Sequence, residues 1–171
     1  MYNKCKMETD TKIFFWKENN KYGFLSNFYY SSFKDSLGFT YIYNEQYFMA
    51  QKCLLFDSEN KKLLKEIMEC KIPITIKKLG RKVNNFNQHI WDKEKYNIMK
   101  TGVKYKFSQN KFLKKKLLET KDKLLFEASP YDKIWGIGIN HNEASKLPIT
   151  DFKGENLLGK ALMEVRSELK N

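Results

Sequence analysis

One apolar stretch of the chain, YNEQYFMAQKCLLF at residues 43–56, contains a carboxylate and a lysine. Glu45 and Lys52 are seven residues apart, and because each helical residue advances about 100°, they return to nearly the same side of a helix. Met49 and Phe56 fall close to the same line, so this side is apolar. Because helical side chains lean toward the helix start, the Lys52 amine and the Glu45 carboxylate can approach one small ligand.

The chemistry of such a pair depends on burial. Desolvation lowers the pKa of a lysine, and the neutral amine is the form that attacks a carbonyl or imine carbon. Glu45 would lie in the first helical turn, where the helix dipole favours the carboxylate, whereas burial favours the acid. The alternative is a lysine whose stem covers apolar surface while its head stays in water, with Glu45 as a surface partner.

A second cluster, LGRKV at residues 79–83, carries two cationic side chains after a glycine. Arg81 and Lys82 suit the oxygens of a phosphate or pyrophosphate. The alternative is that they are ordinary basic residues at the end of a helix.

A third cluster is SPYDKIWGIGI, at residues 129–139. Asp132 at a turn lies near the large ring of Trp135 in sequence, and Gly136 would let a ligand approach the backbone. The alternative is a core tryptophan beside a capping aspartate. Further along, Asn156 in GENLLG is favoured as the cap of the last helix.

Most of the chain is expected to be helical. Apolar spacing and helix start signals predict helices at 44–56, 59–70, 75–83, 92–107, 110–120 and 154–169. Asn44 and Ser58 are the expected N-caps of the first two. The remaining patterns predict a strand at 12–16, an irregular hairpin or loop layer at 23–43, and a strand, a turn and a second extended piece at 123–140. The expected fold class is mainly α, a single compact helical domain with a small β or irregular layer.

Length and composition agree with one domain. The chain has 171 residues, of which 42% are hydrophobic and 15% aromatic, enough to build a core. We expect a flexible segment at 1–12 and a domain at 13–171. The formal net charge of +12 indicates an anionic partner. Because nearly all of this excess is lysine, the charge is compatible with a phosphate-bearing substrate rather than diagnostic of a DNA-binding surface.

Several classes of function are disfavoured. The three cysteines lack CxxC spacing, and His89 and His141 have no partners at ligand spacing, so neither a disulfide framework nor a metal site is expected. The GIG sequence lacks the third glycine of a dinucleotide fingerprint, and no cofactor is expected. No apolar run approaches the ~20 residues of a membrane span, which predicts a cytoplasmic protein that does not bind membranes.

Five blocks of sequence, taken in order, resemble one family. They are NEQYFMAQK at 44–52, LGRKV at 79–83, KFSQN at 106–110, LLFEASPYDKIWGIGI at 124–139 and GENLLGKALMEVR at 154–166. Together they resemble the NADAR family, the YbiA-like N-glycosidases, over about residues 13–166. The long block from Glu-Ala-Ser-Pro to Trp-Gly-Ile-Gly is the most specific part of the resemblance.

The resemblance implies a mainly helical enzyme that cleaves N-glycosidic bonds to an exocyclic amine. It implies two substrates: ADP-ribosylated guanine in DNA or RNA, so that DNA ADP-ribosylation is reversed, or a small phosphorylated ribosylamine, an early ribosylamino-pyrimidine intermediate of riboflavin synthesis. A third possibility, from a different class, is a non-catalytic module that binds ADP-ribose or nucleic acid.

The resemblance also implies roles for individual residues. Lys52 corresponds to a lysine for which a Schiff base is proposed, and Glu45 would shuttle protons to the ring oxygen and the departing amine. Asp132 would bind ribose hydroxyls or assist proton transfer, and Trp135 would stack on the base or ribose. The remaining expected substrate-binding residues are Arg81, Lys82, Gly136, Asn156 and Trp91, and for Trp91 core packing is the stronger interpretation.

Overall fold

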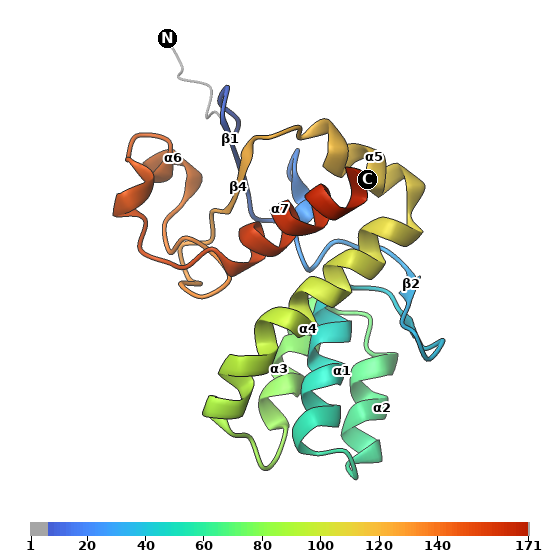
Figure 1. Ribbon diagram of the computed structural model, residues 1–171. Coiled ribbons are helices and arrows are strands. Elements are labelled where there is room, and N and C mark those ends of the chain that lie inside the picture. The colour runs from blue at the N-terminus through green and yellow to red at the C-terminus, as the bar shows by residue number, and fades with distance from the viewer. Residues whose placement is uncertain (1–6, 171) are drawn as a thin grey trace. The chain divides into compact units, whose positions relative to one another are not determined.

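The computed structural model describes residues 7–170, which group into two compact units (Figure 1). Unit 1 joins the N-terminal segment up to residue 26 to the segment from residue 112 onward, and unit 2 comprises residues 27–111. Helices dominate the described residues, and each unit also contains a short two-stranded sheet. The predicted class, a mainly α fold with a small β or irregular layer, is confirmed.

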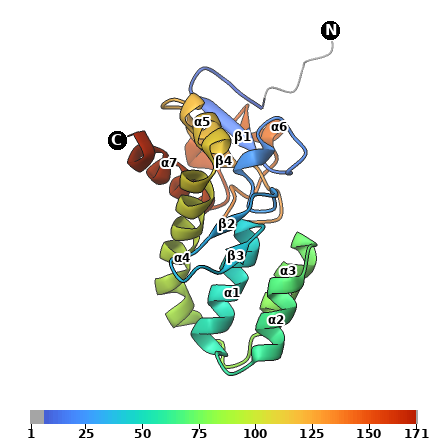
Figure 2. The same cartoon turned by 90° about the vertical axis from the view of Figure 1, so that its right-hand side faces the viewer.

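Unit 2 consists of four helices, a 3-10 turn and a hairpin. In chain order these are β2 (Phe33–Lys34), β3 (Thr40–Tyr41), α1 (Asn44–Phe56), α2 (Lys61–Glu69), α3 (Pro73–Leu79), η2 (Gly80–Lys82) and α4 (Gln88–Gln109). Helix α1 contacts each of the other three, and Figures 1 and 2 show them packed side by side. Residues 44–50 are all buried, so α1 is the central helix of this unit.

Unit 1 combines an N-terminal and a C-terminal segment of the chain. Its elements are β1 (Lys12–Phe15), η1 (Gly23–Leu25), α5 (Lys111–Glu119), β4 (Leu124–Glu127), α6 (His141–Ala144), η3 (Ile149–Asp151) and α7 (Leu157–Lys170). Strands β1 and β4 run parallel, with Lys12 opposite Leu124 and Phe15 opposite Glu127. Parallel strands need a long crossover connection, and here that connection contains all of unit 2.

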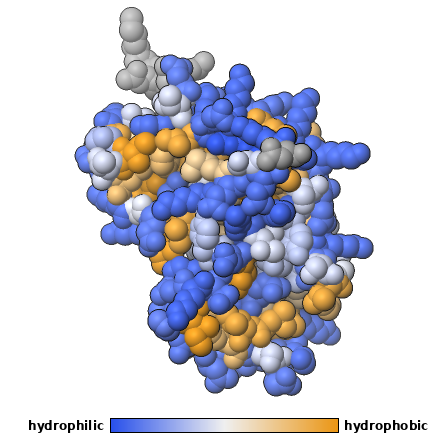
Figure 3. All heavy atoms as spheres, viewed as in Figure 1, coloured by the Kyte–Doolittle hydropathy of each residue, from blue (hydrophilic) through white to orange (hydrophobic). Residues whose placement is uncertain are grey.

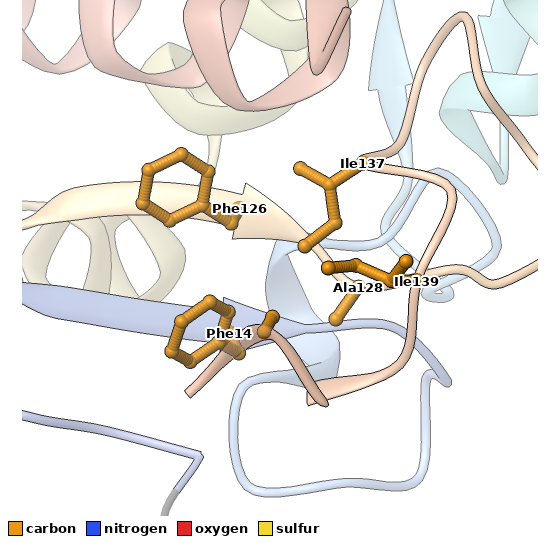
Figure 4. Close-up of a cluster of buried hydrophobic side chains, with 6 residues drawn as sticks. Phe14, Phe126, Ala128, Ile137 and Ile139 are labelled. Carbon is orange, nitrogen blue, oxygen red and sulfur yellow. The ribbon is translucent and has the colours of Figure 1, made fainter. Parts of the chain in front are cut away.

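The core beside this strand pair is apolar. Figure 4 shows Phe14 from β1 and Phe126 from β4 stacked on one side, with ring centroids 5.7 Å apart. Ile137 and Ile139 approach from the segment after β4. That segment was predicted as a second extended piece, but it forms no regular strand. Its main chain instead makes isolated hydrogen bonds, such as the one from the Ile137 N–H to the Glu127 carbonyl at 2.9 Å.

The helix predictions are largely confirmed, with α1 matching its predicted bounds. Two cap predictions are wrong. Tyr43 is the N-cap of α1, because the Asn44 side chain turns inward and donates to Asn27 Oδ1 at 2.7 Å. Ser58 does not cap α2, because Asn60 does so by accepting from the Leu63 N–H.

The other boundaries moved for identifiable reasons. Helix α3 starts at Pro73, since proline is well suited to the first helical turn. Helix α4 starts earlier than predicted because Asn87 caps it, accepting from the Ile90 N–H at 3.1 Å. Helix α7 starts later than predicted, because Asn156 has a left-handed backbone, φ 55°.

The close approach of α7 to β4 depends on a glycine, and this gives a first testable prediction. A Cβ on Gly159 would lie 2.1 Å from the Leu125 carbonyl oxygen, a backbone atom that cannot move aside. Gly159→Ala is therefore expected to lower the free energy of unfolding by about 2–3 kcal/mol through overpacking. Urea denaturation measures this, with Lys160→Ala at the exposed neighbouring position as control. Equal midpoints for the two variants would contradict the packing.

The predicted flexible segment 1–12 lies partly outside the described residues, which begin at residue 7. Within the described part, the Glu8 carboxylate accepts hydrogen bonds from Lys123 at 2.8 Å, from Lys21 at 2.7 Å and from the Tyr22 hydroxyl. These donors, Lys123 first, lower the pKa of Glu8 to about 2. The domain boundary at residue 13 remains a prediction.

Among the helices that residues 7–170 form, none has the length and apolar character needed to cross a membrane.

Candidate active site

Helix α1 is fixed in unit 2 by a buried glutamine that sequence reasoning missed. The Gln46 amide donates to the carbonyls of Met68 at 2.8 Å and Ile67 at 3.1 Å, where α2 ends. Its oxygen accepts from the Ile42 N–H at 2.9 Å. Because one side chain satisfies main-chain groups both before α1 and at the end of α2, α1 has a defined position from which to present its other side chains.

The Lys52 amine lies against an aromatic wall. Its Nζ is 4.3 Å from the ring centroid of Phe86 and 5.6 Å from that of Trp91. Phe56 completes the wall, with ring centroids 5.3 Å from Phe86 and 6.2 Å from Trp91. The Lys52 side chain is therefore half-buried, and its amine lies on aromatic faces.

These surroundings alter the protonation of Lys52. Burial lowers the pKa of the amine, and the positive charge of Arg81 lowers it further. Aromatic faces attract the ammonium by roughly 0.5–2 kcal/mol and so oppose this shift in part. The net direction, a lowered pKa, enlarges the fraction of neutral amine near pH 7 and makes Lys52 the best nucleophile candidate on α1.

Glu45 lies two turns before Lys52 on the same helix, as predicted. It is 5% exposed, and its N–H donates to the Asn27 carbonyl at 3.2 Å. A rise of about 1.5 Å per residue separates the two residues by about 10 Å along the helix axis. The two groups can act on one sugar only if the Lys52 side chain, which leans toward the helix start, spans most of this distance.

Arg81 reaches the Lys52 side of α1 because of tight packing beneath it. A Cβ on Gly80 would lie 1.9 Å from the Met49 sulfur, so the turn η2 sits directly on α1. Arg81 and Lys82 are exposed on that turn, and the charge of Arg81 is close enough to influence Lys52. An exposed guanidinium is a suitable phosphate ligand.

Trp91 is 8% exposed and packs on Phe48, with ring centroids 4.9 Å apart. The packing interpretation made for it from the sequence is therefore correct. Its ring is also one of the three aromatic rings beside the Lys52 amine, a contact that the sequence did not indicate.

The remaining predicted residues belong to unit 1. Asp132 Oδ1 accepts from the N–H groups of Trp135 at 2.8 Å and Ile134 at 3.0 Å, so this carboxylate organises the turn that carries the indole. Packing favours a glycine at position 136, because a Cβ there would lie 2.8 Å from the Glu127 carbonyl oxygen. The indole of Trp135 is only half-buried.

Both polar atoms of the Asn156 side chain form hydrogen bonds within unit 1. Its oxygen accepts from the Glu127 N–H at 3.0 Å, and its nitrogen donates to the Leu125 carbonyl at 2.8 Å. The side chain therefore ties the start of α7 to β4, a different task from the cap interpretation made from the sequence.

In unit 2, then, the structure brings together Lys52, Arg81 and Trp91, with Glu45 on the same helix. Sequence reasoning missed Phe86, which stands alone in the loop NNFNQ and carries no spacing that points to Lys52. It also missed Lys106, which is 1% exposed within α4. Among residues 7–170, no group of three or more His, Cys, Asp or Glu side chains could hold a metal ion.

Comparison with known proteins defines the class of this site. The chain is 47% identical over 169 residues to N-glycosidase R617 of Acanthamoeba polyphaga mimivirus, a match that covers 95% of this chain and 98% of that protein. It is 33% identical over 157 residues to riboflavin biosynthesis protein VVA0006 of Vibrio vulnificus, covering 92% of this chain and 38% of that protein. The class is that of the N-glycosidases, which are hydrolases acting on N-glycosyl bonds.

The fold and the family agree with this class. The NMR structure of the Escherichia coli protein YbiA superimposes with a TM-score of 0.76 at 30% identity, covering 98% of this chain and 90% of that one. The model of the NADAR domain matches residues 14–170, and the chain belongs to this family.

Proposed function

We propose that the chain hydrolyses the bond between ribose C1 and an exocyclic amine, and that it removes ADP-ribose from guanine in DNA or RNA through a Schiff base on Lys52. The observation that carries the proposal is the position of the Lys52 amine, partly buried against Phe86 and Trp91 with a lowered pKa. A nucleophilic amine at neutral pH needs this kind of environment.

The reaction follows from the two groups on α1. A proton from Glu45 to the ribose ring oxygen opens the ring and leaves C1 doubly bonded to the exocyclic nitrogen. The neutral Lys52 amine adds to C1, a proton passes to the exocyclic nitrogen, and the bond from C1 to the base breaks. Water then adds to the lysine Schiff base, which releases the sugar as an aldehyde and restores the amine.

The other residues have supporting roles in the proposal. Arg81 and Lys82 bind phosphate oxygens, and Trp91 shields Lys52 from water. In unit 1, Asp132 holds the turn that carries Trp135, and Asn156 keeps β4 and α7 in register. For Asp132, Trp135 and Gly136, contact with the ribose or base is a role that the family resemblance implies. The positive net charge of +12 favours a polyanionic substrate.

Product analysis tests the choice of substrate. The protein is incubated with an oligonucleotide carrying ADP-ribosylated guanine and, separately, with a ribosylamino-pyrimidine phosphate, and the released base is quantified. We expect efficient release from the oligonucleotide. Turnover of the small phosphate alone would show that the ribosylamino-pyrimidine phosphate is the substrate, with the same mechanism. The name of the Vibrio vulnificus relative, a riboflavin biosynthesis protein, supports this second substrate.

A non-catalytic reader of ADP-ribose is the remaining alternative. Holding Glu45 at 5% exposure and Lys52 in an aromatic environment carries a desolvation cost that a simple binding module does not need. Tight binding of ADP-ribose without release of base from either substrate over hours would favour the reader.

The effect of Arg81 on Lys52 gives a prediction with a defined sign. Because Arg81 lowers the pKa of Lys52, Arg81→Ala raises it, and a higher pH is then needed to form the neutral amine. The acidic limb of the pH–rate profile should therefore move to higher pH. Arg81→Lys, which keeps the charge, and Lys82→Ala should leave the limb near its wild-type position. An unmoved limb in Arg81→Ala would mean that Lys52 does not titrate in that limb.

A further inference from the structure

The loop between η2 and α4 is held to the end of α1 by one carboxylate. Asp57, the residue after α1, accepts through Oδ2 from the Asn84 N–H and side-chain amide, both at 3.1 Å, and from the Asn60 amide at 3.0 Å. These bonds lower the pKa of Asp57, so it is ionised at neutral pH, and charge-assisted bonds of this kind are the stronger ones.

This attachment determines where Phe86 lies. Asn84 is bound to Asp57, Asn85 takes a left-handed backbone with φ 54°, and Asn87 caps α4 through the Ile90 N–H. Phe86 is therefore fixed from both sides in sequence, and its ring packs edge-on against Phe56 at 5.3 Å. The loop thus places one aromatic ring beside the end of α1.

Phe86 differs from Trp91 in one respect that matters for binding. Both rings lie near the Lys52 Nζ, but Phe86 is 41% exposed, whereas Trp91 is 8% exposed. Ile90, one turn along, is 43% exposed. Figure 3 shows hydrophobic side chains on the surface at this end of unit 2, where α1 ends and α4 begins. Part of the Phe86 side chain is thus accessible to a ligand.

The chemistry of the proposed reaction places the leaving base in the same region. When Lys52 attacks C1, the base is attached to that carbon through a single nitrogen, so its ring must lie within a few ångströms of Nζ. The Phe86 centroid is 4.3 Å from Nζ. An aromatic ring at that distance can stack on a planar base of any type.

We propose that Phe86 binds the planar leaving group of the substrate by stacking, and that Asp57 is a positioning residue that holds Phe86 in place for this contact. The inference rests on the function proposed above and adds to it a specificity element, since a sugar without a planar group cannot use Phe86.

The test compares variants at Phe86 on the ADP-ribosyl-guanine oligonucleotide. Phe86→Ala is expected to lower kcat/KM by about 10- to 100-fold, the range that removal of a base-stacking ring produces. Phe86→Trp should retain most of the activity, and Phe86→Leu should lose most of it although it stays apolar. Phe39→Ala, which removes a 58% exposed ring from the hairpin, is the matched control and should behave as wild type.

A double-mutant cycle, measured as kcat/KM, tests the positioning role of Asp57. Asp57→Ala should lower kcat/KM in the same way, and Asp57→Ala combined with Phe86→Ala should be no worse than Phe86→Ala alone, because one residue acts through the other. Additive losses would overturn the positioning role. Because Asp57→Ala also frees Asn60, circular dichroism confirms that the variants are folded, and the Phe86 variants test the stacking contact independently.

A base-free ligand separates this inference from the function itself. Borohydride reduction in the presence of ADP-ribose, whose open form is an aldehyde, should label Lys52 equally in wild type and in Phe86→Leu. Equal labelling with unequal turnover supports the stacking role. If the wild type is neither labelled nor active, the proposed function fails, whereas equal turnover of wild type and Phe86→Ala overturns only the present inference.

Discussion

Lys52→Ala is expected to abolish turnover of the ADP-ribosyl-guanine oligonucleotide, with a loss of roughly 10³-fold or more, as for removal of a covalent nucleophile. The physical reason is that the proposed reaction needs an amine to attack C1, and the amine in question is the Lys52 Nζ, held 4.3 Å from the Phe86 ring centroid. Borohydride added during turnover should attach the sugar to wild-type protein, and mass spectrometry of peptides should locate it at Lys52.

Lys52→Arg provides the matched control, because it keeps a cation against the aromatic wall but cannot form a Schiff base at neutral pH. We expect it to bind the substrate and remain inactive. Normal turnover by either variant, or a reduced adduct at a different lysine, would show that the nucleophile is assigned to the wrong residue.

Lys106→Met is expected to stabilise the protein at neutral pH, by about 1–3 kcal/mol, in line with other replacements of buried charged groups by apolar ones. Lys106 is 1% exposed, with Nζ 5.1 Å from the Phe107 ring centroid and 5.6 Å from that of Tyr29. Burial lowers its pKa to about 7. Above that pH the folded protein therefore holds this amine largely neutral, whereas the unfolded chain still protonates it up to about pH 10.5.

The sign of the pH dependence follows from this difference. Between pH 7 and the ordinary lysine value of 10.5, the unfolded chain binds a proton that the folded protein does not, so wild-type stability rises with pH by up to about 1.4 kcal/mol per unit. The penalty is complete below pH 7 and disappears above 10.5. Lys106→Met removes this contribution, so the advantage of the variant should shrink as pH increases.

Urea denaturation of both proteins at several pH values between 6 and 10 measures that difference, since the titrations of all other groups cancel between them. Lys93→Met, an exposed lysine of the same helix, is the control and should track wild type. Parallel stability curves for wild type and Lys106→Met would show that Lys106 keeps an ordinary pKa in the folded protein.

The features predicted correctly from the sequence are those that depend on helical periodicity. Helix starts were predicted wrongly where they depend on which single side chain forms the cap. The bounds of α1 and the shared face of Glu45 and Lys52 follow from a regular helix, so they were found. The helix starts at Asn60 and Asn87 were missed, because several asparagines and serines compete as caps in each loop and only tertiary contacts select one. Asn44, chosen as a cap, is instead buried against Asn27.

The candidate site was predictable to a similar extent. Lys52 was identifiable as a charged residue in an apolar helix, but two of the three rings around it, Phe86 and Trp91, come from segments more than thirty residues later. Nothing in NNFNQ indicates that Phe86 would reach this amine, because that depends on the bond between Asp57 and Asn84. Contacts of this kind between distant segments have no signature in a single sequence.

The pairing of β1 with β4 has a consequence for synthesis of the protein on the ribosome. Helices α2, α3 and α4, which pack on α1, lie between residues 27 and 111, so these contacts can form once this segment has emerged. Strand β1 is translated first but has its pairing edge open until Leu124–Glu127 appears. The nascent chain therefore carries an apolar strand, KIFF, that is prone to mispairing throughout most of translation, and a chaperone that binds extended apolar segments would find its target there.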